Sequence, residues 1–149
     1  MLLLGTATTA SAVETGSVTW QSVKQGGQCL TWDVNYINDI PNWVGLDGCG
    51  SHRGWITWND NDLGNGYWQE KANGRNACLD SNDHGDGSGS VYIGNCTNNN
   101  AYQQWSEQHF NNGWRLVNHA TGLCLDSNNP GQPLYTYVCT DGNPYQLWS

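Results

Sequence analysis

The chain has 149 residues, with nine tryptophans, six cysteines and a formal net charge of −8. This length is typical of one domain, and five basic residues provide no positive patch for nucleic-acid phosphates or anionic lipid. The sequence also lacks a run of roughly 20 apolar residues, the length that spans a bilayer. Composition and charge therefore argue against nucleic-acid binding and membrane insertion.

Residues 1–12 resemble the end of a secretion signal. Leu2, Leu3 and Leu4 are followed by small residues, and Ala10-Ser11-Ala12 matches the A-x-A cleavage pattern. The basic segment and the longer apolar run of a complete signal are missing from these residues. We expect a secreted protein that begins at Val13, with a single domain over residues 13–149.

From Trp20 onward, the order tryptophan, Cys-Leu, cysteine, tryptophan occurs three times. The first cysteines lie 49 and 46 residues apart (78−29 and 124−78), a period typical of a repeat architecture. The copies span about 15–62, 63–108 and 109–149. Each second cysteine is followed nine positions later by a tryptophan: Cys49 by Trp58, Cys96 by Trp105 and Cys139 by Trp148.

The segments between these landmarks are short and rich in turn residues. Nineteen glycines and several Asn-Gly, Asp-Gly and Gly-Asn pairs indicate many tight turns. No segment shows helical periodicity over three turns. The sequence therefore predicts an all-β fold.

The cysteine spacing alternates between short distances within a copy and long distances between copies. The repeat therefore favours one disulfide in each copy, which pairs Cys29 with Cys49, Cys78 with Cys96, and Cys124 with Cys139. Zinc binding is the alternative explanation for paired cysteines, but the sequence contains no C-x-x-C motif to support it. Disulfides indicate an oxidising compartment.

The Cys-Leu-Asp strings at Cys78 and Cys124, together with Gln103-Gln104-Trp105 and Gln146-Leu147-Trp148, resemble the Q-x-W signature of ricin B-type β-trefoil lectins. The resemblance covers about residues 15–149. It implies a β-trefoil of twelve strands, four per repeat, in which a six-strand barrel is closed by three hairpins. The Q-x-W tryptophan would lie in the core, and its glutamine would bond to backbone.

The resemblance also implies one shallow sugar pocket in each repeat. A carboxylate accepts hydrogen bonds from sugar hydroxyls, an aromatic ring covers the apolar face of the sugar, and amides both donate and accept. The third repeat carries the most complete set: Asp126, Asn128, Tyr135, Tyr137 as the stacking ring, and Gln146. The second repeat has Asp80, Tyr92 and Gln103, with Gly94 at the stacking position. The first has Thr31, Gly45, Asp47 and Ile56 at the corresponding places, so we expect its site to be lost.

Structural roles compete with these assignments. Asp80 and Asp126 could cap backbone N–H groups in Asx-turns. Aromatic residues precede the Q-x-W position in all three copies, which favours a packing role for Trp55, Tyr102 and Tyr145. The tryptophans in register are expected in the core: Trp20, Trp58, Trp68, Trp105, Trp114 and Trp148. Trp32, Tyr36 and Trp43 have no counterparts and either fill the enlarged first-repeat loop or form a second contact surface.

The predicted function is that of a secreted, monomeric, non-catalytic carbohydrate-binding protein with no cofactor and no metal. The rival hypothesis is a β-trefoil scaffold that binds a protein partner, for instance as a protease inhibitor, through loops carrying Trp32 and Trp43. Motifs such as H-E-x-x-H, G-x-S-x-G and the phosphate-binding Walker sequence are absent, and residues 80–89 lack the ligand pattern of an EF-hand.

Overall fold

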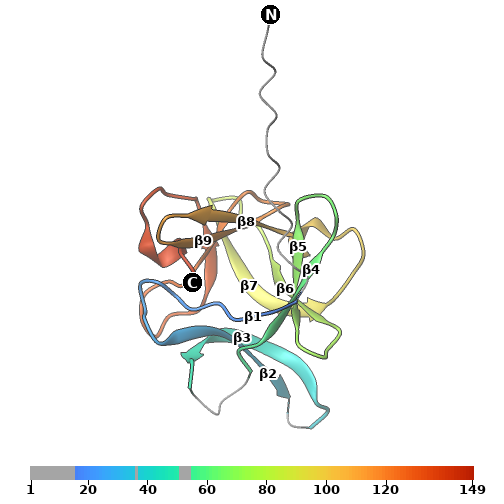
Figure 1. Ribbon diagram of the computed structural model, residues 1–149. Helices are drawn as coiled ribbons and strands as arrows, with labels where there is room; N and C mark the ends of the chain where they lie inside the picture. Colours follow the sequence, from blue (N-terminus) through green and yellow to red (C-terminus); the bar gives the residue numbers. More distant parts are fainter. Residues whose placement is uncertain (1–15, 36, 51–54) are drawn as a thin grey trace, which may run out of the picture.

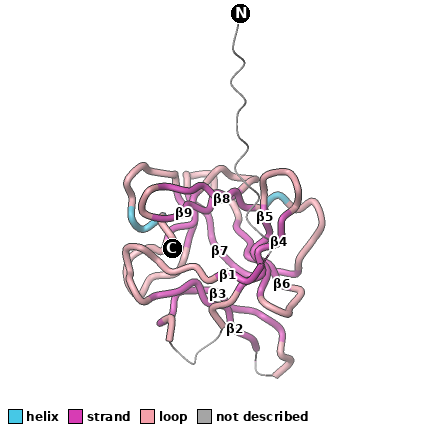
Figure 2. The backbone as a smooth tube through the Cα atoms, viewed as in Figure 1, coloured by secondary structure: helices cyan, strands magenta, loops and turns pink. Residues whose placement is uncertain are grey.

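The computed structural model describes residues 16–35, 37–50 and 55–149, and these form eleven strands and two 3-10 helices (Figures 1 and 2). The predicted secretion signal with its cleavage before Val13, and Tyr36, lie outside the described residues. The strands are β1 (Gly16–Val18), β2 (Gln28–Asn35), β3 (Ile40–Gly48), β4 (Trp58–Asp62), β5 (Trp68–Ala72), β6 (Ala77–Ser81), β7 (Ser88–Asn95), β8 (Trp105–Phe110), β9 (Gly113–Asn118), β10 (Cys124–Asp126) and β11 (Tyr135–Tyr137). The 3-10 helices are η1 (Ala101–Gln103) and η2 (Pro144–Gln146).

Each repeat contributes one antiparallel hairpin to the fold. β2 pairs with β3, β6 with β7, and β10 with β11. Neighbouring repeats are joined where β4 pairs with β5 and β8 pairs with β9. The first hairpin forms a two-stranded sheet of its own, and the nine other strands form one continuous sheet (Figure 1).

The ends of the repeats close the barrel. Trp148 forms bridges to Ser22 and to Trp114, and Gln21 and Ser149 exchange two backbone hydrogen bonds of 2.9 Å. The segment at Trp148 therefore takes the place of the fourth strand of the third repeat, so eleven named strands provide the twelve-strand arrangement. This arrangement is a β-trefoil, as predicted.

Turn residues set the strand boundaries. Between β5 and β6, Gly74 has a φ of 73°, a left-handed conformation that glycine adopts without a steric cost. Arg75 N–H then donates to the Ala72 carbonyl at 2.9 Å, which closes the turn. The Asn-Gly pairs in the sequence thus separate strands as expected.

The core repeats the same tryptophan–leucine contact three times. The indole Nε1 of Trp58 donates to the Leu30 carbonyl at 3.0 Å. The three tryptophans and three leucines that make these contacts are all fully buried. The equivalent bonds are Trp105 to Leu79 at 3.1 Å and Trp148 to Leu125 at 3.2 Å. Each bond satisfies a buried N–H that would otherwise be costly, and it ties the end of a repeat to that repeat's hairpin.

The predicted core position is confirmed for Trp20, Trp58, Trp105 and Trp148. Trp68 and Trp114 are only half-buried, although Trp114 packs against the edge of the core cluster. Trp68 is the first residue of β5 and Trp114 the second residue of β9, so both lie at the start of a strand. Their core assignment was therefore too strong.

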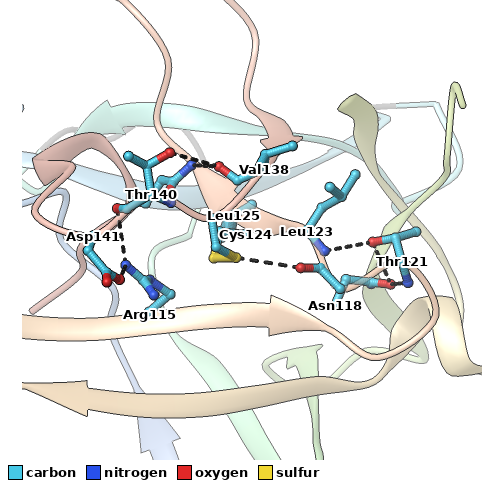
Figure 3. Close-up of a disulfide and its surroundings, with 12 residues drawn as sticks. Arg115, Asn118, Thr121, Leu123, Cys124, Leu125, Val138, Thr140 and Asp141 are labelled. Carbon is cyan, nitrogen blue, oxygen red and sulfur yellow. Dashed lines mark hydrogen bonds and ion pairs between the residues drawn. A yellow bond between two sulfur atoms is a disulfide. The ribbon is translucent and has the colours of Figure 1, made fainter. Parts of the chain in front are cut away.

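The three predicted disulfides are present, with Cα–Cα distances of 5.0, 5.0 and 5.1 Å. Each joins the first strand of a hairpin to the segment just beyond its second strand. Around the third bridge, Arg115 of β9 donates to the Thr140 carbonyl at 3.1 Å and contacts the Asp141 carboxylate (Figure 3). The bridge and these contacts hold the segment after β11 against the barrel.

Among the described residues, neither helix has the length or the apolar character needed to cross a membrane.

Candidate functional site

Asp126 is the last residue of β10 and pairs with Tyr135 of β11. Its side chain is 2% exposed, and its Oδ1 accepts a hydrogen bond of 2.8 Å from the Asn128 N–H. Asn128 has a φ of 58°, and its side chain donates to the Pro133 carbonyl at 2.9 Å. The predicted Asx-turn is therefore present, and it fixes the carboxylate at the start of the loop that leads to β11.

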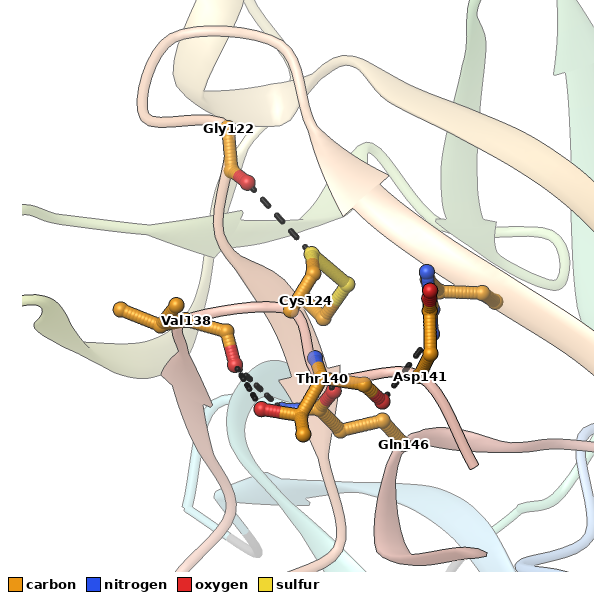
Figure 4. A network of polar contacts seen from close by, with 8 residues as sticks. Gly122, Cys124, Val138, Thr140, Asp141 and Gln146 are labelled. Atoms are coloured by element: carbon orange, nitrogen blue, oxygen red, sulfur yellow. Dashed lines mark hydrogen bonds and ion pairs between the residues drawn. A yellow bond between two sulfur atoms is a disulfide. The ribbon is translucent and has the colours of Figure 1, made fainter. Parts of the chain in front are cut away.

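The Gln146 side chain hydrogen-bonds to this carboxylate and to the neighbouring backbone. Its Nε2 donates to the Val138 carbonyl at 2.9 Å, and its Oε1 accepts from the Thr140 N–H at 2.9 Å (Figure 4). Burial raises the pKa of Asp126, while hydrogen bonds from the Asn128 N–H and the Gln146 side chain act in the opposite direction. Gln146 is fully buried, and through these bonds it positions Asp126 and the segment around Cys139.

An open pocket of about 150 Å³ lies in front of Asp126. It brings together three of the predicted residues, Asp126, Asn128 and Tyr135, with three others, Asn129, Asn143 and Tyr145. One carboxylate, three amides and two phenol rings therefore face the same space. Such a set can accept and donate hydrogen bonds and can cover an apolar surface.

Tyr137 lies beside the pocket. Its ring centroid is 5.6 Å from that of Tyr135, and its side chain is 44% exposed. Burial raises the pKa of Tyr135, and the neighbouring Asp126 and Tyr137 contribute to the rise. Tyr137 is thus an exposed ring next to Tyr135 and does not itself line the pocket.

Trp55 and Tyr102 are 45% and 43% exposed, so neither lies in the core, and of the two only Trp55 has a packing contact with a core ring among the described residues, because it stacks on the buried Trp32. Tyr145 is half-buried, lines the pocket, and lies under the Lys24 ammonium, which is 5.5 Å from its ring centroid. Tyr102 and Tyr145 are the middle residues of η1 and η2, the turns that precede the Q-x-W tryptophans, and Trp55 has the equivalent position in the first repeat. That turn lies at the surface even though the tryptophan itself is buried.

Asn143 is a pocket residue that the sequence interpretation missed. Its side chain accepts from the Tyr145 N–H at 3.1 Å and caps η2. Asn100 caps η1 in the same way, through the Tyr102 N–H at 3.1 Å. Both asparagines lie three positions before a Q-x-W glutamine, a repeated spacing that could have identified them.

The second repeat has the same buried framework with a different surface. Gln103 Nε2 donates to Asp80 and to the Asn95 carbonyl, both at 2.9 Å, and Gln103 Oε1 accepts from the Thr97 N–H at 2.9 Å. Asp80 pairs with Tyr92, whose pKa is raised by burial and then by the Asp80 carboxylate. The second-repeat residues Asp80, Tyr92 and Gln103 therefore lie together.

Gly94 occupies the place that Tyr137 has in the third repeat. A Cβ on Gly94 would lie 3.4 Å from Asp80 Oδ2 and 3.6 Å from Gln103 Nε2, which are ordinary contact distances. The position next to the carboxylate and the amide is therefore open, without a ring to cover a ligand.

The first repeat lacks this chemistry, as the sequence indicates. Thr31 is fully buried, and its hydroxyl donates to the Cys29 carbonyl at 2.9 Å. Trp32 is buried and stacks on Trp55 at a centroid distance of 4.7 Å, so Trp32 packs in the core and not at a contact surface. Trp43, by contrast, is exposed.

One group of three carboxylates could hold a metal ion among the residues that the structure describes: Asp60, Glu70 and Glu107, whose oxygens lie within 4.8 Å of one another. Burial raises the pKa of Asp60 to about 8, and burial with the neighbouring carboxylates raises that of Glu70 well above its usual value. Burial also raises the pKa of Glu107. These shifts favour carboxyl groups that share protons. The group lies outside the residues that line the Asp126 pocket.

The family model of the ricin-type β-trefoil lectin domain matches residues 16–148. The chain therefore belongs to the ricin-type β-trefoil lectin domain family.

Solved structures agree on the fold. A designed threefold-symmetric protein, ThreeFoil, is 21% identical with a TM-score of 0.71, over 89% of this chain and 95% of that one. A Polyporus squamosus lectin, bound to a human-type influenza-binding epitope, is 18% identical with a TM-score of 0.76, over 93% of this chain and 49% of that one. SeviL, bound to asialo-GM1 saccharide, is 17% identical with a TM-score of 0.65, over 91% of this chain and 95% of that one. No curated protein matches the sequence at a significant level.

Proposed function

We propose that the protein binds carbohydrate without catalysis, chiefly through the third-repeat pocket. The observation that carries this proposal is the convergence of the Asp126 carboxylate with Tyr135, Tyr145 and the side chains of Asn128 and Asn143 on one open hollow. A sugar ring presents adjacent hydroxyls on its edge and C–H groups on its face. This pocket offers a partner for each.

Asp126 would accept hydrogen bonds from two neighbouring hydroxyls. Its orientation is fixed in advance by the Asn128 N–H and by Gln146, so little ordering is needed when a sugar binds. Tyr137, exposed at the rim, would cover the apolar face of the sugar, as its place in the family pattern implies. Tyr145 and Asn143 would complete the opposite wall.

The second repeat would provide a weaker site. Asp80 and Gln103 reproduce the pair of Asp126 and Gln146, and Tyr92 and Tyr102 are exposed beside them. Gly94 leaves the stacking position without a ring. The first repeat would bind no sugar, because Thr31 replaces the carboxylate and points into the fold.

Other features are consistent with this proposal. Lectins of similar fold were solved with bound saccharides. Three disulfides suit a secreted protein, and the charge of −8 disfavours nucleic acid as a partner. We propose that the protein acts outside the cell as a monomer.

A glycan array probed with the purified chain tests the proposal. We expect binding to a defined set of glycans, and we expect Asp126→Asn to abolish most of the signal. Thr31→Ser is the matched control, because it keeps the buried hydroxyl at the equivalent position of the first repeat. A silent array with correctly folded protein contradicts the proposed function.

A further inference from the structure

A second hollow lies beside the Asp126 pocket. It has a volume of about 310 Å³ and runs between β3 and the loop at residues 129–134. Its walls come from two repeats that are distant in sequence. They include Gln25, Gln28, Trp43, Leu46, Gln132 and Pro133. We call this hollow the Trp43 groove.

Trp43 provides the groove with a flat aromatic wall. Its side chain is 46% exposed, and its ring lies against Gly45, two residues along β3. A Cβ at Gly45 would overlap the ring, so the absence of a side chain there lets the ring lie against the strand. The groove therefore presents an aromatic face whose position is set by the backbone beneath it.

The rest of the groove is polar but uncharged. None of the residues that line it carries a formal charge, and four of them carry side-chain amides: Gln25, Gln28, Asn129 and Gln132. Amides donate and accept hydrogen bonds at once, as hydroxyl-rich ligands require. This lining suits a neutral sugar better than an anion or a charged peptide.

The groove and the pocket share a wall. Asn129 lines both hollows. Its loop is held on both sides, because Asn128 Oδ1 accepts from the Asn129 N–H at 2.7 Å and Gln25 Nε2 donates to the Asn128 carbonyl at 2.8 Å. A ligand chain that leaves the pocket across Asn129 therefore enters the groove directly.

Size points to the same arrangement. The pocket alone, at about 150 Å³, is smaller than the roughly 300–1,000 Å³ of typical small-molecule sites. The adjoining groove brings the combined volume into that range. One sugar ring suits the pocket, and further rings require the groove.

We propose that the pocket and the Trp43 groove form one extended site for a neutral oligosaccharide, in which Trp43 stacks on a sugar beyond the one bound at Asp126. This inference rests on the proposed function. It predicts that the protein binds oligosaccharides more tightly than single sugars, and it assigns Trp43 to carbohydrate recognition.

The test uses a glycan array that contains each terminal sugar alone and at the end of chains of two to six sugars. Five proteins are compared: the wild type, Trp43→Ala, Trp43→Phe, Asp126→Asn and a control variant. The wild type should bind extended glycans more tightly than their terminal sugars. Trp43→Ala should weaken binding of the extended glycans about 10-fold, as expected for loss of an aromatic contact worth about 1.4 kcal/mol, and leave the terminal sugars unaffected.

Trp43→Phe should restore part of the lost affinity, because it keeps a smaller ring. Ile40→Ala is the matched control, since Ile40 is an exposed residue of the same strand that does not line the groove. Circular dichroism and thermal melting of each variant show whether the fold is kept.

The outcomes separate the two proposals. If Asp126→Asn abolishes binding but Trp43→Ala has no effect, or weakens single sugars and chains equally, the extended site is refuted and the proposed function stands. If the folded wild type binds no glycan, both fail. Capture of a protein partner through Trp43 without glycan binding would favour the scaffold hypothesis instead.

Discussion

The side-chain amide of Gln103 donates a hydrogen bond of 2.9 Å to the Asp80 carboxylate, although 23 residues separate them. In the third repeat, the Gln146 side chain also hydrogen-bonds to Asp126, which opposes the rise that burial causes in the pKa of Asp126. Each glutamine also bonds to backbone on both sides of the second cysteine of its repeat: Gln103 to Asn95 and Thr97, which flank Cys96, and Gln146 to Val138 and Thr140, which flank Cys139. The glutamine therefore links the hairpin, the disulfide and the carboxylate.

Gln146→Ala should destabilise the protein. The Val138 carbonyl and the Thr140 N–H would lose their buried partner, at a cost of about 3 kcal/mol in the free energy of unfolding, or roughly 6–12 °C in Tm. Thermal unfolding measures the change. Gln108→Ala, at an exposed position of β8, is the control and should melt like the wild type. An unaltered Tm for Gln146→Ala would show that the amide does not hold this segment.

Asp126→Asn should separate sugar binding from stability. Asparagine keeps an oxygen that can accept from the Asn128 N–H, so the Asx-turn should persist. The free energy of unfolding, measured by thermal melting, should therefore change by less than about 1 kcal/mol. The charged acceptor is lost, and affinity should fall at least about 10-fold. Asp80→Asn should reduce binding less. Equal losses in the two variants, measured by calorimetric titration, would contradict the ranking of the repeats.

Tyr137 and Tyr145 of the third repeat differ in burial, so Tyr137→Ala and Tyr145→Ala should differ in their effects on stability. Tyr137 is exposed, so its removal should cost about 1 kcal/mol of affinity and little stability. Tyr145 is half-buried and lines the pocket, so its removal should cost affinity and also about 1–2 kcal/mol of stability. This loss of stability is smaller than the roughly 3–5 kcal/mol that truncation of a fully buried ring costs, because Tyr145 is only half-buried. Sugar titration and melting of both variants check it, and full binding by Tyr145→Ala would exclude that ring from the site.

The features predictable from the sequence are those that depend on position within a repeat. The spacing of the cysteines fixed the hairpin disulfides, because each bridge closes one repeat. The spacing of Cys-Leu and Q-x-W marked residues that meet in the core, such as Leu79 and Trp105. The pairing of Asp126 with Tyr135 on adjacent strands follows from the same register.

Contacts between repeats were not predictable in this way. Asn129 and Trp43 come together only when the first and third repeats pack side by side. Asp60, Glu70 and Glu107 lie on β4, β5 and β8, and charged residues in a sequence are ordinarily assigned to the surface. The exposure of Tyr102 depends on the direction of a 3-10 turn, which has no periodic signal.

The carboxyl cluster should make stability depend on pH. The pKa of Asp60 is raised from 3.8 to about 8, and those of Glu70 and Glu107 are also raised. Between about pH 4 and pH 8 the folded state therefore keeps protons that the unfolded state has released. Its stability is full at the acidic end and falls as the pH rises, by up to about 1.4 kcal/mol per pH unit for each proton kept.

Melting curves between pH 5 and pH 9, recorded with a chelator, measure this slope. Glu70→Gln should flatten it, because an amide cannot ionise yet its oxygen can still accept from Trp20 Nε1, which lies 3.1 Å from Glu70 Oε2. Asp86→Asn is the control, since Asp86 is exposed and its lowered pKa places its effect below this range. A Tm that rises with pH over the interval would contradict the shared-proton interpretation.

Gly94→Tyr should strengthen the second-repeat site. Gly94 pairs with Cys78 just as Tyr137 pairs with Cys124, and a Cβ there would meet Asp80 and Gln103 at ordinary contact distances. Its φ lies outside the left-handed region, so a side chain introduces no backbone strain. The new ring would stand beside Asp80 as Tyr137 stands beside Asp126. In an Asp126→Asn background, Gly94→Tyr should therefore recover binding of the same glycans, with a gain of about 1 kcal/mol in affinity. Gly94→Ala in that background is the control, because it adds the Cβ without the ring. If the folded tyrosine variant binds no better than the alanine variant, the ring at this position does not contribute to the site, and the stacking role of Tyr137 loses its support.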